Sequence, residues 1–349
     1  MAIKIKIETK NSASKPRASV TQIPKIISLF AGAGGMDLGF LQEGFDVSVA
    51  IDLEESAINT HKKNFVGTVS LAADLTVLGP QGVLQFVKKN IIPGTKIGVI
   101  GGPPCQGFSR ANPGSRPDDP RNLLPSLYLE IIKALQEEYS IEFVVFENVL
   151  GMKDPKHWAK YEELINGLKK LRFIVTEKEL CALDFGVPQN RNRIIISAMR
   201  KARGYTQVIP IKRKGKSTVR ETIGDLGEPA FFKKGLNINE IPEHPNHWTM
   251  QPKSERFRNP DIDKKTRSFR RLVWDKASPT IAFGNREIHL HPLGTRRLSI
   301  YEAMLLQGFP PTFVLKGNLS QQVTQISNAV PPPLTRSVAA AVKKSMQGK

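Results

Sequence analysis

The sequence predicts a doubly wound α/β fold on a mostly parallel, Rossmann-like sheet, accompanied by a smaller and more irregular second domain. Between residues 25 and 200, short apolar runs alternate with segments of helical periodicity. Several of these runs are followed by loops that carry Gly, Pro or an acidic residue. After residue 200 the alternation gives way to scattered Pro, Gly, Lys and Arg. We therefore expect an α/β domain first and an irregular domain after it.

The individual elements follow from the same periodicities. Short apolar runs are typical of strands buried on both faces, and they occur at 26–30, 47–52, 97–101, 142–146, 173–178 and 193–198, with a further short strand before Asp74. Helical periodicity occurs at 36–43, 56–64, 82–90, 123–138, 158–171, 297–307 and 333–346. Residues 1–24 read as a basic, disordered tail that includes a possible short strand at 3–7.

The charge of the chain favours a polyanionic partner. Its 349 residues carry a net charge of +19, and residues 200–271 hold 18 Lys or Arg against 8 Asp or Glu. Such clustering favours nucleic-acid binding over a merely soluble surface. No run of 18 apolar residues is present, and we expect neither a membrane span nor a secretory signal. Only two cysteines occur, which fits a reducing, cytoplasmic compartment.

A glycine-rich turn follows the first strand. It reads Phe-Ala-Gly-Ala-Gly-Gly over 30–35, and such glycines allow a ligand to approach the backbone. The dinucleotide pattern requires another glycine where Asp37 stands, and an acidic residue opposes a pyrophosphate at a helix N-terminus. A cofactor without phosphates is therefore favoured. The alternative is an ordinary strand-to-helix turn.

Two acidic residues end the next strands. Asp52 lies 20 residues after Gly32, where a carboxylate can accept hydrogen bonds from ribose hydroxyls. Asp74 can bind an exocyclic amine. Each can equally be a helix cap or a surface charge.

Cys105 follows a rigid Pro-Pro turn at the ligand-facing edge of the predicted sheet. This setting suggests a nucleophile, whereas Cys181 has no such context and is interpreted as structural. Polar residues at 110–122 suit a lid. Glu147 ends the following strand near the cysteine loop, where exclusion of water would raise its pKa and make it a proton donor. A solvent-facing Glu is the alternative.

Two cations stand on alternate residues where the last strand begins. Arg191 and Arg193 place their side chains on one face, which can meet a phosphate or a carbonyl oxygen. His244 and His247 lack neighbouring cysteines, so we expect no metal site.

Together these segments resemble the DNA (cytosine-5)-methyltransferase family. The matching motifs occur in the family's order, from the glycine turn to Asn328-Ala329-Val330-Pro331. Between these lie Pro103-Pro104-Cys105-Gln106, Glu147-Asn148-Val149, Gln189-x-Arg191-x-Arg193, and Arg297 with Glu302 and Gln307-Gly308-Phe309-Pro310. Two positions depart from the family, which usually has Glu at Asp52 and Gly at Ser327.

The resemblance implies S-adenosylmethionine as methyl donor and carbon 5 of cytosine in duplex DNA as acceptor. It implies a Rossmann-like class I methyltransferase fold in which Cys105 attacks carbon 6 of a flipped-out base and Glu147 acts on N3. Arg193 would hold the carbonyl at carbon 2, with Arg191 supporting the phosphate or the loop. The implied cofactor-binding residues are Phe30, Gly32, Gly34, Gly35, Asp52, Leu53, Asp74, Leu75, Pro104 and Asn328. The implied DNA-binding residues are Ser109, Arg121, Gln189 and Arg297.

The resemblance also divides the chain. It implies a catalytic domain over 25–200 and 326–349, with the last helix returning to it, and a target-recognition domain over 201–325. It further implies a monomer that can be paired with a cognate restriction endonuclease and that, in a bacterium, is associated with the nucleoid. Two alternatives are a tRNA cytosine methyltransferase, whose Cys-Phe-Thr element is absent here, and a DNA-binding relative without activity.

Overall fold

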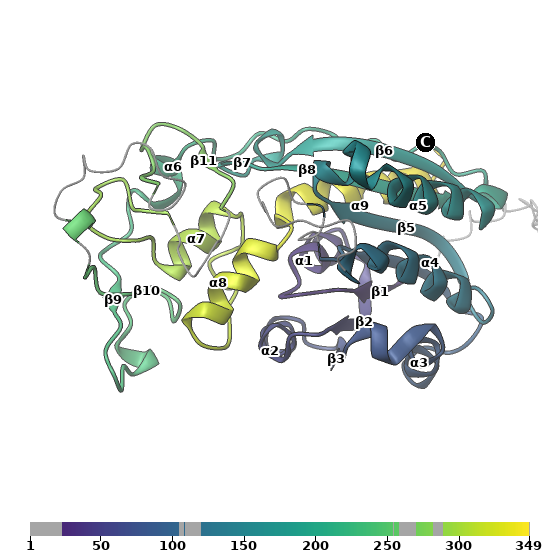
Figure 1. Ribbon diagram of the computed structural model, residues 1–349, viewed down its shortest axis with the longest axis horizontal. Coiled ribbons are helices and arrows are strands. Elements are labelled where there is room, and N and C mark those ends of the chain that lie inside the picture. The colour runs from purple at the N-terminus through teal and green to yellow at the C-terminus, as the bar shows by residue number, and fades with distance from the viewer. Residues whose placement is uncertain are drawn as a thin grey trace, which may run out of the picture.

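A seven-stranded sheet forms the centre of the larger part of the molecule (Figure 1). The computed structural model describes residues 23–104, 108, 120–253, 255–257, 270–281 and 289–348. The strand order is β3-β2-β1-β4-β5-β8-β6. The bounds are β1 Lys25–Leu29, β2 Asp46–Asp52, β3 Val69–Ala72, β4 Lys96–Gly101, β5 Ser140–Asn148, β6 Phe173–Cys181 and β8 Asn192–Arg200.

The sheet is doubly wound and mostly parallel, as predicted. Strands β1 to β5 are parallel to one another, and only β8 runs antiparallel to its neighbours, β5 on one side and β6 on the other. The chain proceeds outward from β1 through β2 and β3, then returns to β4 on the other side of β1. The strand order therefore reverses between β1 and β4, and sheets of this kind bind ligands in a crevice outside the carboxyl ends of the strands at this point.

Helices cover both faces of this sheet. On one face lie α3 (Leu75–Asn90), α4 (Leu124–Leu135) and α5 (Trp158–Lys170), whose buried leucine, isoleucine and valine side chains pack on the strands. On the other face, α1 (Gly35–Gln42) packs with α9 (Pro332–Met346) around Phe40, Leu334 and Val338. The last helix thus returns to the first part of the chain. The remaining helix, α2 (Glu55–Asn64), connects β2 to β3.

A smaller part lies to one side of the sheet (Figure 1). It contains two pairs of two-residue strands, β9 (Ala230–Phe231) with β10 (Trp248–Thr249) and β7 (Gln189–Asn190) with β11 (Ser278–Pro279). Its helices are α6 (Val219–Ile223), α7 (Ile300–Leu306) and α8 (Leu319–Asn328). One apolar core joins Leu298, Phe309 and Val323 of this part to Ala33 and Phe65 beside the glycine turn.

The structure corrects three sequence predictions. Helix α8 was not predicted, and the expected domain boundary after residue 325 falls inside it. Helix α3 begins at Leu75 rather than 82, with a kink where Gly79 has φ 64° and precedes Pro80. Helix α7 begins at Ile300 rather than 297, after the Ser299 cap. The predicted strand at 3–7 and most of the predicted lid lie outside the described residues. Within the described part of the chain, no helix is both long and apolar enough to span a bilayer.

Candidate active site

The glycine turn connects β1 to α1 at the crevice. Phe30, Gly32 and Gly34 all have positive φ, at 55°, 55° and 92°. A side chain at Gly34 would lie 2.3 Å from the Phe65 ring, so packing and backbone conformation both require glycine there. Gly32 differs, because no atom lies within 4 Å of where its Cβ would be. The turn therefore leaves open space beside its first glycine.

Asp52 is hydrogen-bonded to this turn. One carboxylate oxygen accepts from the Gly32 N–H at 2.8 Å, and the other accepts from the Glu54 N–H at 2.9 Å. Burial raises the pKa of Asp52, although both N–H groups oppose the rise. The adjacent Leu53 side chain is 62% exposed, which is unusual for a large apolar residue. The end of β2 thus offers an anchored carboxylate and an uncovered apolar surface.

Asp74 caps α3. Its Oδ1 accepts from both the backbone N–H and the hydroxyl of Thr76, at 2.8 and 2.7 Å, and the Thr76 hydroxyl is the main cause of the lowered Asp74 pKa. This is the cap that the sequence left open as an alternative. Leu75 is 3% exposed and packs in the core, so its backbone rather than its side chain can reach a ligand.

The predicted nucleophile loop begins at the end of β4. Cys105 and Ser109 lie outside the described residues, as does most of 106–119. The described residues leading to Cys105 are Pro103, which is buried and accepts a 3.3 Å hydrogen bond from the Asn148 amide, and Pro104, which is exposed. The chain that enters the loop is therefore tied to the carboxyl end of β5.

Glu147 is buried at this end of β5. Its side chain is 9% exposed and its Oε1 lies 2.7 Å from Arg193 Nε. Burial raises the pKa of Glu147, and the positive charges of Arg193 and Arg191 offset only part of that rise. Its other oxygen, Oε2, would lie 2.9 Å from a Cβ placed on Gly102. Glycine at 102 thus makes room for the carboxylate three residues before Cys105.

Arg191 and Gln189 are internal tethers. Arg191 is 1% exposed, and its Nη2 donates to the Ser327 and Ala329 carbonyls at 2.8 and 3.0 Å. Gln189, expected to contact DNA, is instead fully buried and donates to the Gln307 side-chain oxygen at 2.7 Å. Both side chains therefore connect the start of β8 to the segments that follow α7 and α8.

Three further predicted residues come from separate segments of the chain. Arg121 is half-buried in the short 3₁₀ helix Pro120–Leu123. Arg297 is half-buried, with its guanidinium carbon 6.0 Å from the centre of the Phe257 ring. Asn328 is exposed at the end of α8. The loop after Asn328 touches the glycine turn, because a Cβ on Gly35 would lie 2.4 Å from the Val330 carbonyl oxygen.

Sequence reasoning missed two contributions. Asp37, interpreted as a charge facing the ligand, is fully buried, and its Oδ2 lies 3.0 Å from His61 Nε2. Its position beside Met36 on a short apolar helix is the signal that indicated burial. Gly102 was also overlooked, although a glycine directly before Pro-Pro at a strand end indicates close packing.

These features define a class of protein: a Rossmann-like methyltransferase with a buried carboxyl group beside the predicted cysteine loop. A family model described as C-5 cytosine-specific DNA methylase matches residues 24–344. The chain therefore belongs to the C-5 cytosine-specific DNA methylase family, and it is a DNA methyltransferase that acts on carbon 5 of cytosine.

Individual relatives agree with this assignment. The Type II methyltransferase M.MthTI of Methanothermobacter thermautotrophicus is 32% identical over 93% of this chain and 98% of its own. M1.HphI of Haemophilus parahaemolyticus is 33% identical, covering 91% and 86%. A solved structure described as a DNA modification methyltransferase encoded within a prophage (E. coli) has a TM-score of 0.74 at 26% identity, covering 93% and 99%. The EhMeth methyltransferase of Entamoeba histolytica shares the fold, with a TM-score of 0.65 at 15% identity.

Proposed function

We propose that Cys105 is the nucleophile of this methyltransferase and that Glu147 is its proton donor. The Cys105 thiolate adds to carbon 6 of cytosine, forming a C–S bond while Glu147 protonates or hydrogen-bonds N3. Carbon 5, now an enamine carbon, would take the methyl group from the sulfonium of the methyl donor, whose methyl–sulfur bond breaks to leave a neutral thioether. Loss of the carbon 5 proton to a base then expels the thiolate and restores the aromatic ring.

The observation that supports these roles is the environment of Glu147. A carboxyl group with a pKa raised by burial retains a proton more readily than an exposed one. It packs against Gly102, at the start of the segment that leads to Cys105. Arg193, 2.7 Å from Glu147, is well placed to hold the carbonyl oxygen at carbon 2. Arg191 and Gln189 are proposed as positioning residues rather than substrate contacts, because both are buried.

The residues of the crevice fit S-adenosylmethionine, which supplies an activated methyl group when bound. The open space beside Gly32 admits a ligand against the backbone, and a side chain there would fill it. We assign the ribose hydroxyls to Asp52 and the adenine face to Leu53, which is exposed for stacking. Phe30, Gly34 and Gly35 would shape the turn, Asp74 and the Leu75 backbone would contact the adenine edge, and Pro104 and Asn328 would border the donor site. This chemistry needs no metal.

DNA is proposed to lie between the sheet and the smaller part, with the target base flipped into the crevice. Arg121, Arg297 and Ser109 would contact it. The division into a catalytic domain and a target-recognition domain over about 201–325 is retained, with the second boundary moved past α8. Because several relatives are named Type II methyltransferases, we further propose a monomeric, cytoplasmic enzyme paired with a restriction endonuclease.

The assigned nucleophile is tested by Cys105→Ser. This variant should lose methyl transfer to DNA while retaining DNA binding, and a duplex carrying 5-fluorocytosine should trap the wild-type protein covalently at residue 105. Undiminished transfer by the variant would refute the assignment. Offering tRNA beside duplex DNA tests the substrate, since methylation of tRNA alone would contradict the proposal.

A further inference from the structure

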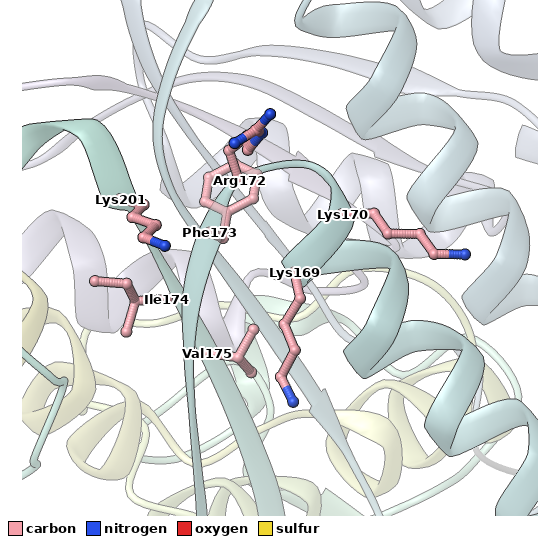
Figure 2. A pocket seen from close by; sticks show the side chains of 7 residues that line it. All are labelled: Lys169, Lys170, Arg172, Phe173, Ile174, Val175 and Lys201. Atoms are coloured by element: carbon pink, nitrogen blue, oxygen red, sulfur yellow. The ribbon is translucent and has the colours of Figure 1, made fainter.

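A basic site, separate from the crevice, lies at the opposite end of the sheet. A cavity of about 630 Å³ there is lined by seven residues, four of them cations and three apolar: Lys169, Lys170, Arg172, Phe173, Ile174, Val175 and Lys201 (Figure 2). None of the described residues that line it is acidic. All four cations are exposed. None forms an ion pair with another described residue, so their charge is available to a ligand.

The site is remote from the active site. Phe173 pairs with Arg200, next to Met199, which pairs with Phe143 on β5. Because Phe173 to Val175 line the cavity, it is level with residues 142–144 of β5, about three to five residues from Glu147. At about 3.3 Å per residue that is roughly 10 to 17 Å along the strands, in addition to the width of two further strands. A duplex seated at the crevice reaches the cavity only through DNA that flanks the target.

Two carbonyls at the end of α5 are paired without the side chains of the four cations. The Lys169 carbonyl accepts from the Arg172 backbone N–H, and the carbonyl of Leu171, directly after α5, accepts from Arg200 Nη1, both at 3.0 Å. Arg200 also lies 4.2 Å from the Phe173 ring centre, which fixes the apolar floor of the cavity. The side chains of Lys169, Lys170 and Lys201 form no hydrogen bond or ion pair with another described residue.

Arg172 occupies a backbone conformation that favours glycine. Its φ is 68°, and a glycine or asparagine usually holds this position after a helix. An arginine there costs stability that a glycine would not, and its cationic side chain lines the cavity. Figure 2 shows the cationic side chains projecting in different directions from α5, the turn and the segment after β8. This arrangement suits a ligand with several spaced phosphates rather than one phosphate group.

We propose that this cavity binds the phosphate backbone of DNA flanking the target, as a second DNA contact beyond the catalytic crevice. The proposal rests on the assignment of duplex DNA as substrate. Its consequence is that long DNA binds more tightly than a short duplex holding only the target, and that this difference depends on salt, because each phosphate contact steepens the salt dependence by about 0.9.

The test compares a triple variant, Lys169→Ala with Arg172→Ala and Lys201→Ala, with a control of equal charge, Lys62→Ala with Lys63→Ala and Lys89→Ala. The control lysines are also exposed and lie in or near the last turns of α2 and α3. For a long duplex, we expect the first variant to lose roughly tenfold in affinity or more, and its salt slope to become shallower by about two to three. The triple variant should methylate a short duplex as fast as the wild type does. A wild-type protein that does not methylate the short duplex would instead count against the assignment of DNA as the substrate.

Arg172→Gly separates binding from folding. Because glycine tolerates a φ of 68°, this variant should melt at the same or a higher temperature than wild type and yet bind long DNA more weakly. Unchanged long-DNA affinity in both cavity variants would overturn the proposal. So would an equal loss in the control triple variant, because it would show a general effect of net charge.

Discussion

Two opposing influences act on the pKa of Glu147. Burial favours the neutral carboxyl group, while Arg193 at 2.7 Å favours the carboxylate. The net rise in pKa leaves a group that can donate a proton or a short hydrogen bond when a cytosine enters the crevice. Because Arg193 is proposed to hold the carbonyl oxygen at carbon 2 of the base, we expect the Glu147–Arg193 pair to respond jointly to the substrate. The orientation of the Glu147 carboxylate should therefore matter as much as its charge.

Gly102→Ala tests that orientation. The added Cβ would lie 2.9 Å from Glu147 Oε2, which is the end of a flexible side chain, so the carboxylate should move aside at little cost in stability. We expect kcat to fall by about tenfold to a hundredfold, with the melting temperature nearly unchanged. In a Glu147→Gln background, whose own loss should be about a hundredfold or more, the glycine substitution should add little. Fully additive losses in single-turnover methylation would contradict this coupling.

At the scale of elements, one arginine holds together three segments. Arg191 begins the β8 segment and donates to the carbonyls of Ser327 and Ala329, where α8 passes into α9. Arg191→Met preserves volume and leaves both carbonyls without this donor. A loss of about 3 kcal/mol in the free energy of unfolding is expected. Urea denaturation measures this loss, and Lys178→Met at an exposed position on β6 serves as the control. A loss of stability no larger than that of the control would refute the proposed role of Arg191 in holding these segments together.

Glu142 supports the amino end of β5. Burial alone would raise its pKa, but hydrogen bonds from Tyr205, Ser140 and Arg203 outweigh it, and the pKa of Glu142 is lowered. A lowered pKa contributes stability above the unfolded value, about 4.3, that is lost as pH falls through the folded value. Glu142→Gln should therefore be less stable than wild type at pH 7, and the gap should narrow below about pH 4. Thermal melts of the variant and the wild type across this pH range measure the difference in stability. A difference that does not change with pH would exclude a contribution of Glu142 protonation to stability.

The elements also show which parts of the fold can be predicted from sequence patterns. The core strands were predictable because Ile, Val and Phe runs buried on both faces leave little ambiguity. Helix α8 was missed because Ser, Gln and Thr dominate it, although apolar Leu319, Val323 and Ile326 recur at helical spacing and Asn318 with Gln321 forms a capping box. Gln189 was predicted to contact DNA, and its internal hydrogen bond to Gln307 could not be predicted because the sequence does not reveal which polar residues pair inside the fold. The proposed catalytic residues were predictable from motifs, whereas the Gly102 contact depends on tertiary packing.

At the scale of the whole molecule, the smaller part is not an independent appendage. Its core continues into Ala33, which lies within the glycine turn proposed to hold the methyl donor, and into Phe65, whose ring packs against that turn. A buried polar network secures it, with Arg296 paired to Glu302 by two 2.9 Å hydrogen bonds at 3% and 1% side-chain exposure. Loosening the smaller part should therefore disturb the cofactor turn as well as DNA recognition.

Acid should loosen this part first. His244, His289 and His291 are all buried there, and burial lowers the pKa of each. A histidine with a lowered pKa contributes stability above its unfolded value, about 6.5, and that contribution is lost as pH falls, at about 1.4 kcal/mol per unit of depression. His244 stacks on Tyr301 at 4.2 Å and accepts from the Asn246 N–H, so its protonation opposes a packed contact and a hydrogen bond.

We therefore expect the free energy of unfolding to fall between pH 7 and pH 5, with S-adenosylmethionine affinity falling alongside it because the two parts share one core. His244→Gln removes one titrating group and should lose part of this acid sensitivity, even if it is less stable at pH 7. Denaturant titrations followed by tryptophan fluorescence, paired with calorimetry of the methyl donor, measure both quantities. An acid response identical in the variant and the wild type would exclude His244 as a contributor and shift the effect to His289 and His291.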